Sequence, residues 1–298
     1  MLNRSMLNRS PRLVRLVRRL PLLAIALLLP SRWVLAEDSV RVVMRETRGG
    51  VLIEDLTFKN SLEQYEVAYR ICPAAMTKPV PGILYVHWLD SSEPTSNRSQ
   101  FVGEAVELAK AGACSVLIDT MWSQPDWFNH RDPAKDKRAT ERQAAKVKSA
   151  LDFLLASPHV DPARVAFVGH DFGAMTGAIL SSDERRVQAW AFQAGTARWF
   201  DWYQFGRKLE GEARDKAAAE TSDLDPVARV AKAKGTFLFQ FGTKDDYVPR
   251  EVAEAFFKAA PDPKEIHWYE AGHGLNDAAV QDRTAWLKKV LGLTAAKP

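Results

Sequence analysis

The stretch Arg164–Ala178, RVAFVGHDFGAMTGA, joins an apolar run to an acidic residue between two glycines and then to a series of small residues. The apolar run predicts a buried strand, and the small residues that follow predict a helix packed closely against it. Gly169 and Gly173 flank Asp171 at the tight turn between the two, where a strained backbone needs neighbours without side chains. The pattern therefore predicts a strand, a sharp turn and a helix, with Asp171 at the turn.

Apolar runs alternate with helical segments on both sides of this stretch. The other apolar runs cover residues 82–88, 113–119, 187–195, 236–242 and 265–270. Helical spacing is found at 100–112, 139–157, 250–260 and 277–292. Strands without polar alternation that are separated by helices are typical of a parallel sheet covered on both faces. We therefore predict an α/β fold with a mostly parallel central sheet and helices on both faces.

Residues 40–71 have a different pattern, with short β segments that alternate between apolar and polar residues. This pattern and the Gly49-Gly50 turn predict antiparallel hairpins at one edge of the sheet. Residues 196–234 interrupt the strand–helix rhythm with an aromatic segment and a charged helical one. No repeat or linker divides the remainder, so we expect one domain over 37–298, with a possible short lid at 196–234.

The first 36 residues have the composition of a secretory signal peptide. A basic segment without acidic residues precedes the apolar run 20–29, and small residues end at Ala36. This apolar run is too short to span a bilayer, so we expect cleavage after Ala36, no stable membrane anchor, and a periplasmic or secreted protein. The segment holds seven of the 41 basic residues, so the rest has a net charge of about −3. That charge gives no support to nucleic acid as a partner.

The chain has two cysteines, Cys72 after one predicted strand and Cys114 at the start of another. Export would allow them to form a disulfide, but free buried cysteines are also common. The sequence spacing does not decide between a disulfide and two free cysteines.

Reactive residues follow several predicted strands at their carboxyl ends, where open α/β sheets bind ligands. Asp171 comes first, then Asp245 with its neighbour Asp246, and finally His273. A histidine with a pKa near neutrality serves as a base, and a carboxylate fixes its tautomer. Alone, Asp171 could be a helix N-cap. The ordered set favours a catalytic site.

Three segments, VDPARVAFVGHDFGA, QFGTKDDYVP and YEAGHG, resemble the corresponding segments of α/β-hydrolases, and the layout is most similar to the dienelactone hydrolase group. The resemblance implies that Asp171 takes the nucleophile position, usually a serine, with Asp245 as the triad acid and His273 as the base. The N–H of Phe172 would be one oxyanion donor, and the second would come from Trp88 or Leu89. It implies a small-molecule substrate, and we expect no metal or other cofactor.

Aromatic residues gather in the loops expected at this edge. We expect a pocket for an apolar or aromatic substrate whose walls include Trp122, Trp127, Trp199 and Trp202. His87, at the end of the strand over 82–88, is either part of this wall or a buried histidine of the core.

An aspartate nucleophile suits a different reaction from a serine. Attack of a carboxylate on an ester would give an anhydride, which is uphill, whereas attack on saturated carbon gives an alkyl-enzyme ester that water can hydrolyse. The motif GHDFG is similar to the elbow of epoxide hydrolases, and haloalkane dehalogenases share the mechanism. However, His87-Trp88-Leu89-Asp90 replaces the H-G-x-P turn of epoxide hydrolases, the insertion at 196–234 is short for their lid, and Phe172 stands where dehalogenases have Trp. The alternatives are dienelactone hydrolase-like or carboxylesterase activity with Asp171 as a base for water, and an inactive ligand-binding protein.

Overall fold

A sheet of nine strands forms the centre of the computed structural model, which describes residues 39–90, 97–205 and 209–293. The predicted signal peptide lies outside these residues. All described residues belong to one unit, Val34–Pro298. The strands are β1 (Val40–Arg48), β2 (Val51–Lys59), β3 (Tyr65–Pro73), β4 (Val80–Val86), β5 (Cys114–Ile118), β6 (Val160–His170), β7 (Ala189–Gln193), β8 (Thr236–Gly242) and β9 (Lys264–Tyr269).

The strand order is β1-β2-β3-β5-β4-β6-β7-β8-β9. β1, β2 and β3 pair antiparallel at one edge, β3 pairs antiparallel with β5, and all pairs from β5 to β9 are parallel. The predicted α/β fold with a mostly parallel sheet and N-terminal antiparallel strands is confirmed.

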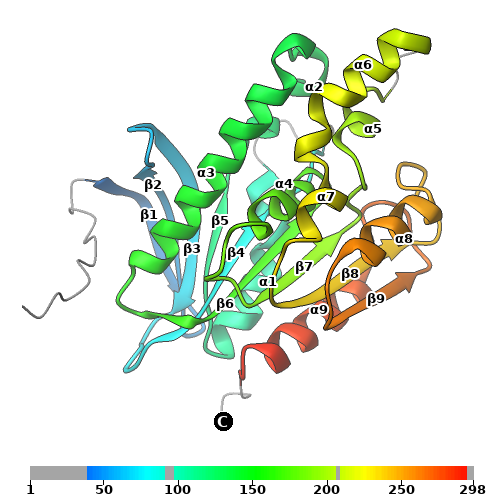
Figure 1. Ribbon diagram of the computed structural model, residues 1–298. Coiled ribbons are helices and arrows are strands. Elements are labelled where there is room, and N and C mark those ends of the chain that lie inside the picture. Colours follow the sequence, from blue (N-terminus) through cyan, green and yellow to red (C-terminus); the bar gives the residue numbers. More distant parts are fainter. Residues whose placement is uncertain (1–38, 91–96, 206–208, 294–298) are drawn as a thin grey trace, which may run out of the picture. The chain divides into compact units, whose positions relative to one another are not determined.

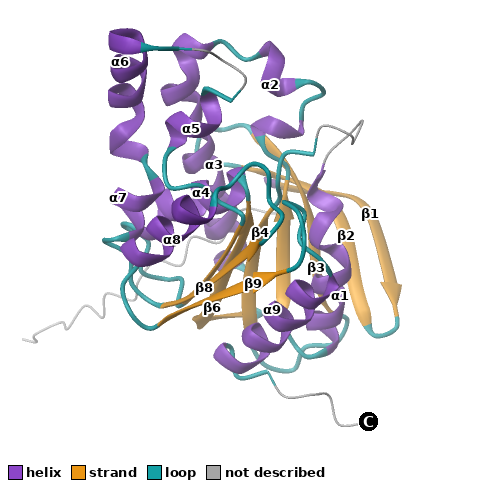
Figure 2. Cartoon of the chain, turned by 90° about the vertical axis from the view of Figure 1, so that its right-hand side faces the viewer, coloured by secondary structure: helices purple, strands orange, loops and turns teal. Residues whose placement is uncertain are grey.

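Helices cover both faces of the sheet (Figures 1 and 2). The α-helices of the described ranges are α1 (Val102–Lys110), α2 (Trp127–His130), α3 (Asp136–Ala156), α4 (Phe172–Ser181), α5 (Trp199–Tyr203), α6 (Gly211–Thr221), α7 (Pro226–Val230), α8 (Arg250–Ala259) and α9 (Asp277–Val290). α1 and α9 pack on one face, and α3, α4, α7 and α8 on the other. None of the helices within the described ranges is long and apolar enough to cross a membrane.

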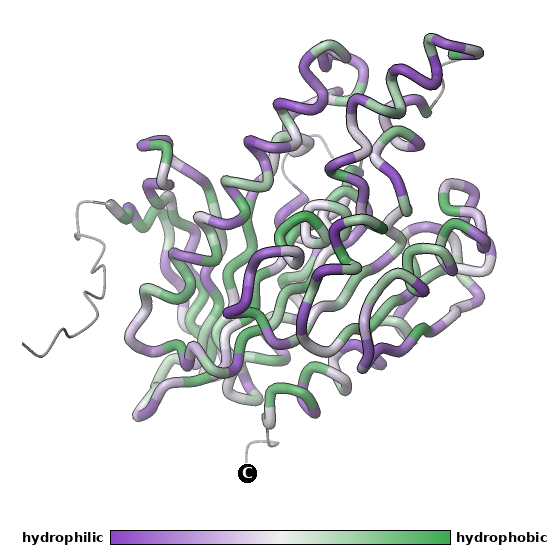
Figure 3. The backbone as a smooth tube through the Cα atoms, in the orientation of Figure 1, coloured by the Kyte–Doolittle hydropathy of each residue, from purple (hydrophilic) through white to green (hydrophobic). Residues whose placement is uncertain are grey.

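The central strands are apolar on both faces because each face has its own core. Along β4, Ile83 and Tyr85 pack with the cluster under α1 and α9, whereas Leu84 and Val86 pack with the cluster under α3 and α4. The strands are correspondingly hydrophobic along their length in Figure 3. This double burial explains why the sequence has continuous apolar runs here rather than period-two alternation.

Cys72 and Cys114 form a disulfide between the neighbouring strands β3 and β5. The register pairs Ile71 with Ser115, so the two cysteines face each other one step further along the antiparallel pair. Of the two possibilities left open by the sequence, the structure has the disulfide.

The interruption at 196–234 holds α5, α6 and α7 between β7 and β8. α5 lies beside the elbow helix α4 through the contacts of its aromatic rings with Phe172. It therefore brings aromatic side chains to the carboxyl edge of the parallel strands.

Candidate active site

Asp171 stands at the turn between β6 and α4 with φ 56° and ψ −118°, a conformation that residues with side chains rarely adopt. The two flanking glycines make this turn possible. A Cβ at Gly169 would lie 2.5 Å from the carbonyl oxygen of Gly173, and a Cβ at Gly173 would lie 2.1 Å from that of Val86. The Asp171 side chain makes no N-cap hydrogen bond, so capping is not its role. The turn instead presents the carboxylate at the edge of the sheet.

The three residues of the expected triad lie together. The Nδ1 atom of His273 is 2.8 Å from Oδ2 of Asp245, and its Nε2 atom is 4.0 Å from Oδ1 of Asp171. Asp245 is fixed because its Oδ1 accepts hydrogen bonds from the backbone N–H groups of Tyr247 and Val248. Its side chain is buried, whereas its neighbour Asp246 is exposed. Of the two candidate acids, Asp245 is the one placed to orient the imidazole.

The two oxygens of the Asp171 carboxylate have different surroundings. Oδ2 accepts a hydrogen bond from the N–H of Leu89 at 3.1 Å, and the N–H of Phe172 also donates to the carboxylate. Oδ1 is buried and has no hydrogen-bond partner among the described residues. The N–H of Trp88 donates instead to Oε1 of Gln100, so Leu89 and not Trp88 supplies the second donor. One carboxylate oxygen is therefore held by the backbone N–H of Leu89, an expected oxyanion donor, and the other faces His273.

Burial governs the protonation of this pair. It raises the pKa of Asp171 to about 7, although the charge of His273 and the two backbone donors act in the opposite direction. Burial lowers the pKa of His273, but its hydrogen bond to Asp245 and the charges of both aspartates outweigh it, so the pKa of His273 is raised above its ordinary value. Asp171 can therefore change protonation near neutrality, as acid–base chemistry requires.

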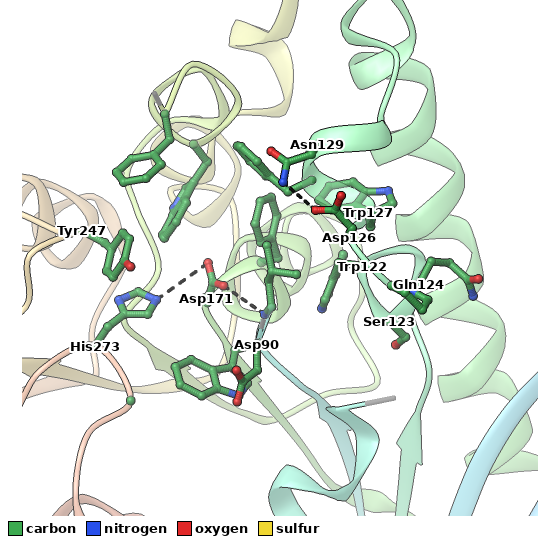
Figure 4. Close-up of a pocket in the computed structure, with 18 residues that line it drawn as sticks. Asp90, Trp122, Ser123, Gln124, Asp126, Trp127, Asn129, Asp171, Tyr247 and His273 are labelled. Atoms are coloured by element: carbon green, nitrogen blue, oxygen red, sulfur yellow. Dashed lines mark hydrogen bonds and ion pairs between the residues drawn. The ribbon is translucent and has the colours of Figure 1, made fainter. Parts of the chain in front are cut away.

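A cavity of about 510 Å³ opens onto Asp171 and His273. Figure 4 shows Tyr247 and His273 on one side of Asp171, and Trp122 and Trp127 on the other. The aromatic lining residues are Trp88, Trp122, Trp127, Phe128, Phe172, Trp202, Phe205 and Tyr247. Asp90 and Asp126 also line the cavity, and no Lys or Arg is among its described lining residues. The cavity is thus mainly apolar, with acidic groups at two positions besides Asp171.

Two residues expected in the pocket wall lie behind it. His87 is buried, with Nδ1 2.7 Å from the carbonyl oxygen of Trp88 and Nε2 2.9 Å from the hydroxyl of Ser123. Burial lowers its pKa to about 4, which makes it a neutral histidine of the core. Trp199 is fully buried and stacks on Tyr203 instead of lining the cavity. Both lie just behind residues that do form the wall.

Several lining residues are absent from the set expected from the sequence. Phe205 follows α5, and Tyr247 lies two positions after the triad acid, stacked on Trp202. Asp90 and Asp126 stand in loops whose direction the sequence does not define. The proximity of Tyr247 to Asp245 is the one available signal, because loops that hold triad residues also form the pocket.

Among the His, Cys, Asp and Glu side chains of the described ranges, no group of three or more is arranged to hold a metal ion.

Comparison with known proteins identifies the family of this chain. A model of the prolyl oligopeptidase family matches residues 105–294, well over half of the chain and all three triad positions. The chain belongs to the prolyl oligopeptidase family. Together with the triad geometry, this membership makes it a hydrolase of the α/β-hydrolase superfamily. No curated protein sequence matches the chain.

Solved structures similar to this member of the prolyl oligopeptidase family include several esterases. An acetyl xylan esterase from Paenibacillus sp. R4 is 15% identical with a TM-score of 0.69, over 84% of this chain and 88% of that one. A Klebsiella pneumoniae subsp. pneumoniae protein assigned as a dienelactone hydrolase is 14% identical with a TM-score of 0.59, over 82% of this chain and 99% of the other. At such identities the likeness shows the fold alone.

Proposed function

We propose that this hydrolase uses Asp171 as a nucleophile on an electrophilic saturated carbon, such as that of an epoxide or an alkyl halide. The observation that carries the proposal is the asymmetry of the Asp171 carboxylate. Oδ2 is held by the Leu89 N–H, while Oδ1 has no hydrogen bond among the described residues and faces His273 across 4.0 Å. An unpaired oxygen is the more nucleophilic one because it has no hydrogen bond to give up.

The reaction has two steps. In the first, a lone pair of Oδ1 forms a C–O bond as the carbon's bond to the epoxide oxygen or halide breaks and its electrons leave with that atom. Halide departs as the anion, and an epoxide oxygen takes a proton, for which Tyr247 is the tyrosine among the described lining residues. The product of this step is an alkyl ester of Asp171.

The second step regenerates the enzyme. His273 accepts a proton from water, and the hydroxide attacks Cγ of Asp171. Negative charge then develops on Oδ2, which already accepts the N–H of Leu89, while the N–H of Phe172 also donates to this carboxylate. Collapse of this intermediate expels the alcohol oxygen, which takes the proton back from His273. The proton left on the Asp171 carboxyl group returns to the Tyr247 phenolate after epoxide opening, or leaves to solvent after halide release, so that Asp171 is again a carboxylate. The donors thus serve the second step without any movement of the carboxylate.

The cavity favours an uncharged, apolar or aromatic substrate. Its walls are mainly aromatic, and the acidic side chains of Asp90, Asp126 and Asp171 disfavour an anion, with no Lys or Arg among the described lining residues. A lactone that bears a carboxylate is therefore disfavoured.

The second candidate is esterase or dienelactone hydrolase-like activity with Asp171 as a base for water. The pKa of about 7 favours it, because it suits a general base at neutral pH. Acetyl xylan esterase and dienelactone hydrolase are also among the similar structures. However, a substrate carbonyl would need the donor that Oδ2 occupies. Ser123 is a poor substitute nucleophile, since its histidine partner His87 has a pKa of about 4.

Adduct trapping separates the two candidates. His273→Gln should let the first step proceed and block the second. Incubation of this variant with an aryl epoxide should raise the intact protein mass by the mass of the epoxide, on the peptide that contains Asp171. The double variant with Asp171→Asn should remain unlabelled, and His130→Gln, which alters an exposed histidine outside the lining, should turn over normally. Turnover of aryl esters without any adduct would favour the second candidate.

We also propose that the chain is exported after cleavage at Ala36. The Cys72–Cys114 disulfide supports this, because such bonds persist in oxidising compartments. Cell fractionation and N-terminal sequencing of the mature protein should find it outside the cytoplasm, beginning at Glu37.

A further inference from the structure

A chain of hydrogen bonds connects the oxyanion loop to the loop of the catalytic histidine. It starts at the backbone N–H of Trp88, which donates to Oε1 of Gln100 at 3.1 Å. Nε2 of Gln100 lies 2.6 Å from Nδ1 of His170, and Nε2 of His170 lies 3.0 Å from the backbone carbonyl oxygen of His273. His170 is the last residue of β6 and directly precedes Asp171. The Gln100–His170 chain thus passes directly behind the nucleophile.

The two ends of the chain fix the direction of every bond. The Trp88 N–H can only donate, so the Gln100 oxygen accepts and its NH₂ group faces His170. The His273 carbonyl oxygen can only accept, so Nε2 of His170 carries a proton. Nδ1 of His170 is then the acceptor for the Gln100 NH₂ group. His170 is consequently neutral, in its Nε2–H tautomer.

The surroundings reinforce this state. His170 is fully buried, and its pKa is lowered well below the ordinary value by burial and by the charge of His273, with smaller contributions from Arg283 and His87. A proton on Nδ1 would also point at the Gln100 NH₂ group. A proton on the His273 imidazole therefore stays there and does not transfer to the neighbouring His170.

Ring packing joins the same segments. The indole of Trp88 stacks on His170 with ring centroids 4.9 Å apart and planes 8° apart. It lies so close to the loop after β9 that a Cβ at Gly274 would meet it at 3.2 Å. Leu89, the oxyanion donor, directly follows Trp88. A shift of Trp88 would therefore move both the donor and the histidine loop.

We infer that Gln100 and His170 are positioning residues, which hold the Leu89 donor and the His273 imidazole in place around Asp171. Neither lines the cavity, so they act on the reacting groups only through Trp88 and His273. The sequence alone predicts no more for His170 than packing beside the elbow. The inference about catalysis rests on the proposed function, whereas the bonding pattern can be tested in the resting protein.

The first test is ¹⁵N NMR of the histidine rings in the unmodified enzyme, assigned with single His variants. His170 should remain in the neutral Nε2–H form from pH 5 to 8 while His273 titrates. An ordinary titration of His170, or an Nδ1–H tautomer, would overturn the inference. This measurement needs no substrate, so its outcome does not depend on whether Asp171 forms an adduct.

The second test uses Gln100, which is only half-buried, so its variants are expected to fold. Gln100→Leu should lower kcat by about 10- to 100-fold, as expected for a misplaced catalytic group, and leave KM nearly unchanged. Gln100→Glu keeps the shape but presents an acceptor to Nδ1 of His170. It should therefore protonate His170 and lower the pKa of His273 in the NMR titration.

The control is Gln188→Leu. Gln188 is likewise a glutamine that bridges two groups, but at the end of β6 opposite the site: its Oε1 accepts from the N–H of Val165 at 2.7 Å, and its Nε2 donates to the carbonyl oxygen of Arg186 at 2.7 Å. The Gln188→Leu enzyme should lose some stability but keep the kcat of the natural enzyme and unchanged titrations of His170 and His273. A Gln100→Leu enzyme with the kcat of this control, or a Gln100→Glu enzyme with an unchanged His170, would contradict the positioning role.

Discussion

Replacement of Asp171 by Asn should make the protein more stable at pH 8 and leave its stability at pH 4 little changed. The carboxylate is fully buried, and burial raises its pKa from 3.8 to about 7. Between these pH values the unfolded chain has released the proton and the folded chain still holds it. The free energy of unfolding of the natural protein therefore falls as the pH rises through this window. Asn is nearly isosteric with the protonated acid and does not titrate. The free energy of unfolding of the Asn variant therefore does not decrease with pH in this way.

The size of the effect follows from the two pKa values. A change from 3.8 to about 7 corresponds to about 4 kcal/mol, since one pKa unit is worth about 1.4 kcal/mol. The attraction of His273, 4.0 Å away, is already part of this pKa, and relaxation of the protein around the buried charge reduces the effect. We therefore expect the variant to gain between about 1 and 4 kcal/mol over the natural protein from pH 4 to pH 8.

Urea denaturation at several pH values between 4 and 8, followed by tryptophan fluorescence, measures this difference. His130→Gln serves as the control for a change at an exposed ionisable residue. A difference between the Asn variant and the natural protein that stays constant from pH 4 to pH 8 would refute the reasoning. It would mean that Asp171 ionises in the folded state as easily as in water.

Three further predictions concern the triad and the elbow. Asp245→Asn should slow adduct breakdown by up to about 10⁴-fold, because it removes the partner that orients His273 and raises the pKa of that histidine. Rapid-quench kinetics would show the adduct accumulating, and an unchanged rate of breakdown would mean that Asp245 does not orient His273. Gly173→Ala should destabilise the fold by about 2 kcal/mol or more, since its Cβ would lie 2.1 Å from the carbonyl oxygen of Val86 in β4. Thermal melts should show this loss, whereas Gly103→Ala, in α1 with open space around its Cβ, should melt like the natural protein. The rate constant of adduct formation should fall about tenfold per pH unit below pH 7 and level off above pH 8, following ionisation of Asp171, and a flat single-turnover profile would exclude that group.

The parallel sheet and the elbow could be predicted because short-range patterns determine them. Continuous apolar runs reflect burial on both faces, and the glycines at 169 and 173 reflect contacts that exclude a Cβ. The triad followed from the order in which Asp171, Asp245 and His273 end their strands. The resemblance already favoured Asp245 over Asp246 as the acid, and the folded loop gives the physical reason: Asp245 turns inward to His273, whereas Asp246 is exposed.

Long-range contacts between loops were not predictable in this way. The side chain of His87 points into the core beside Ser123, and Trp199 packs beneath the wall that Trp202 forms. A loop aromatic or histidine has the same local sequence signal on either side of such a wall. The role inferred for His170 depends on Gln100, seventy residues away in the chain, and no local pattern indicates that bond.

The most direct test of the aspartate nucleophile is a single turnover in ¹⁸O-labelled water with enzyme in excess over an epoxide substrate. Peptide mass analysis then reads the isotope content of the fragment that contains Asp171. If Oδ1 attacks carbon, it leaves with the product and water replaces it, so one ¹⁸O should appear in the Asp171 carboxylate and none in the product. Label in the product and none in Asp171 would show that water attacks the substrate directly, and would contradict the proposed mechanism.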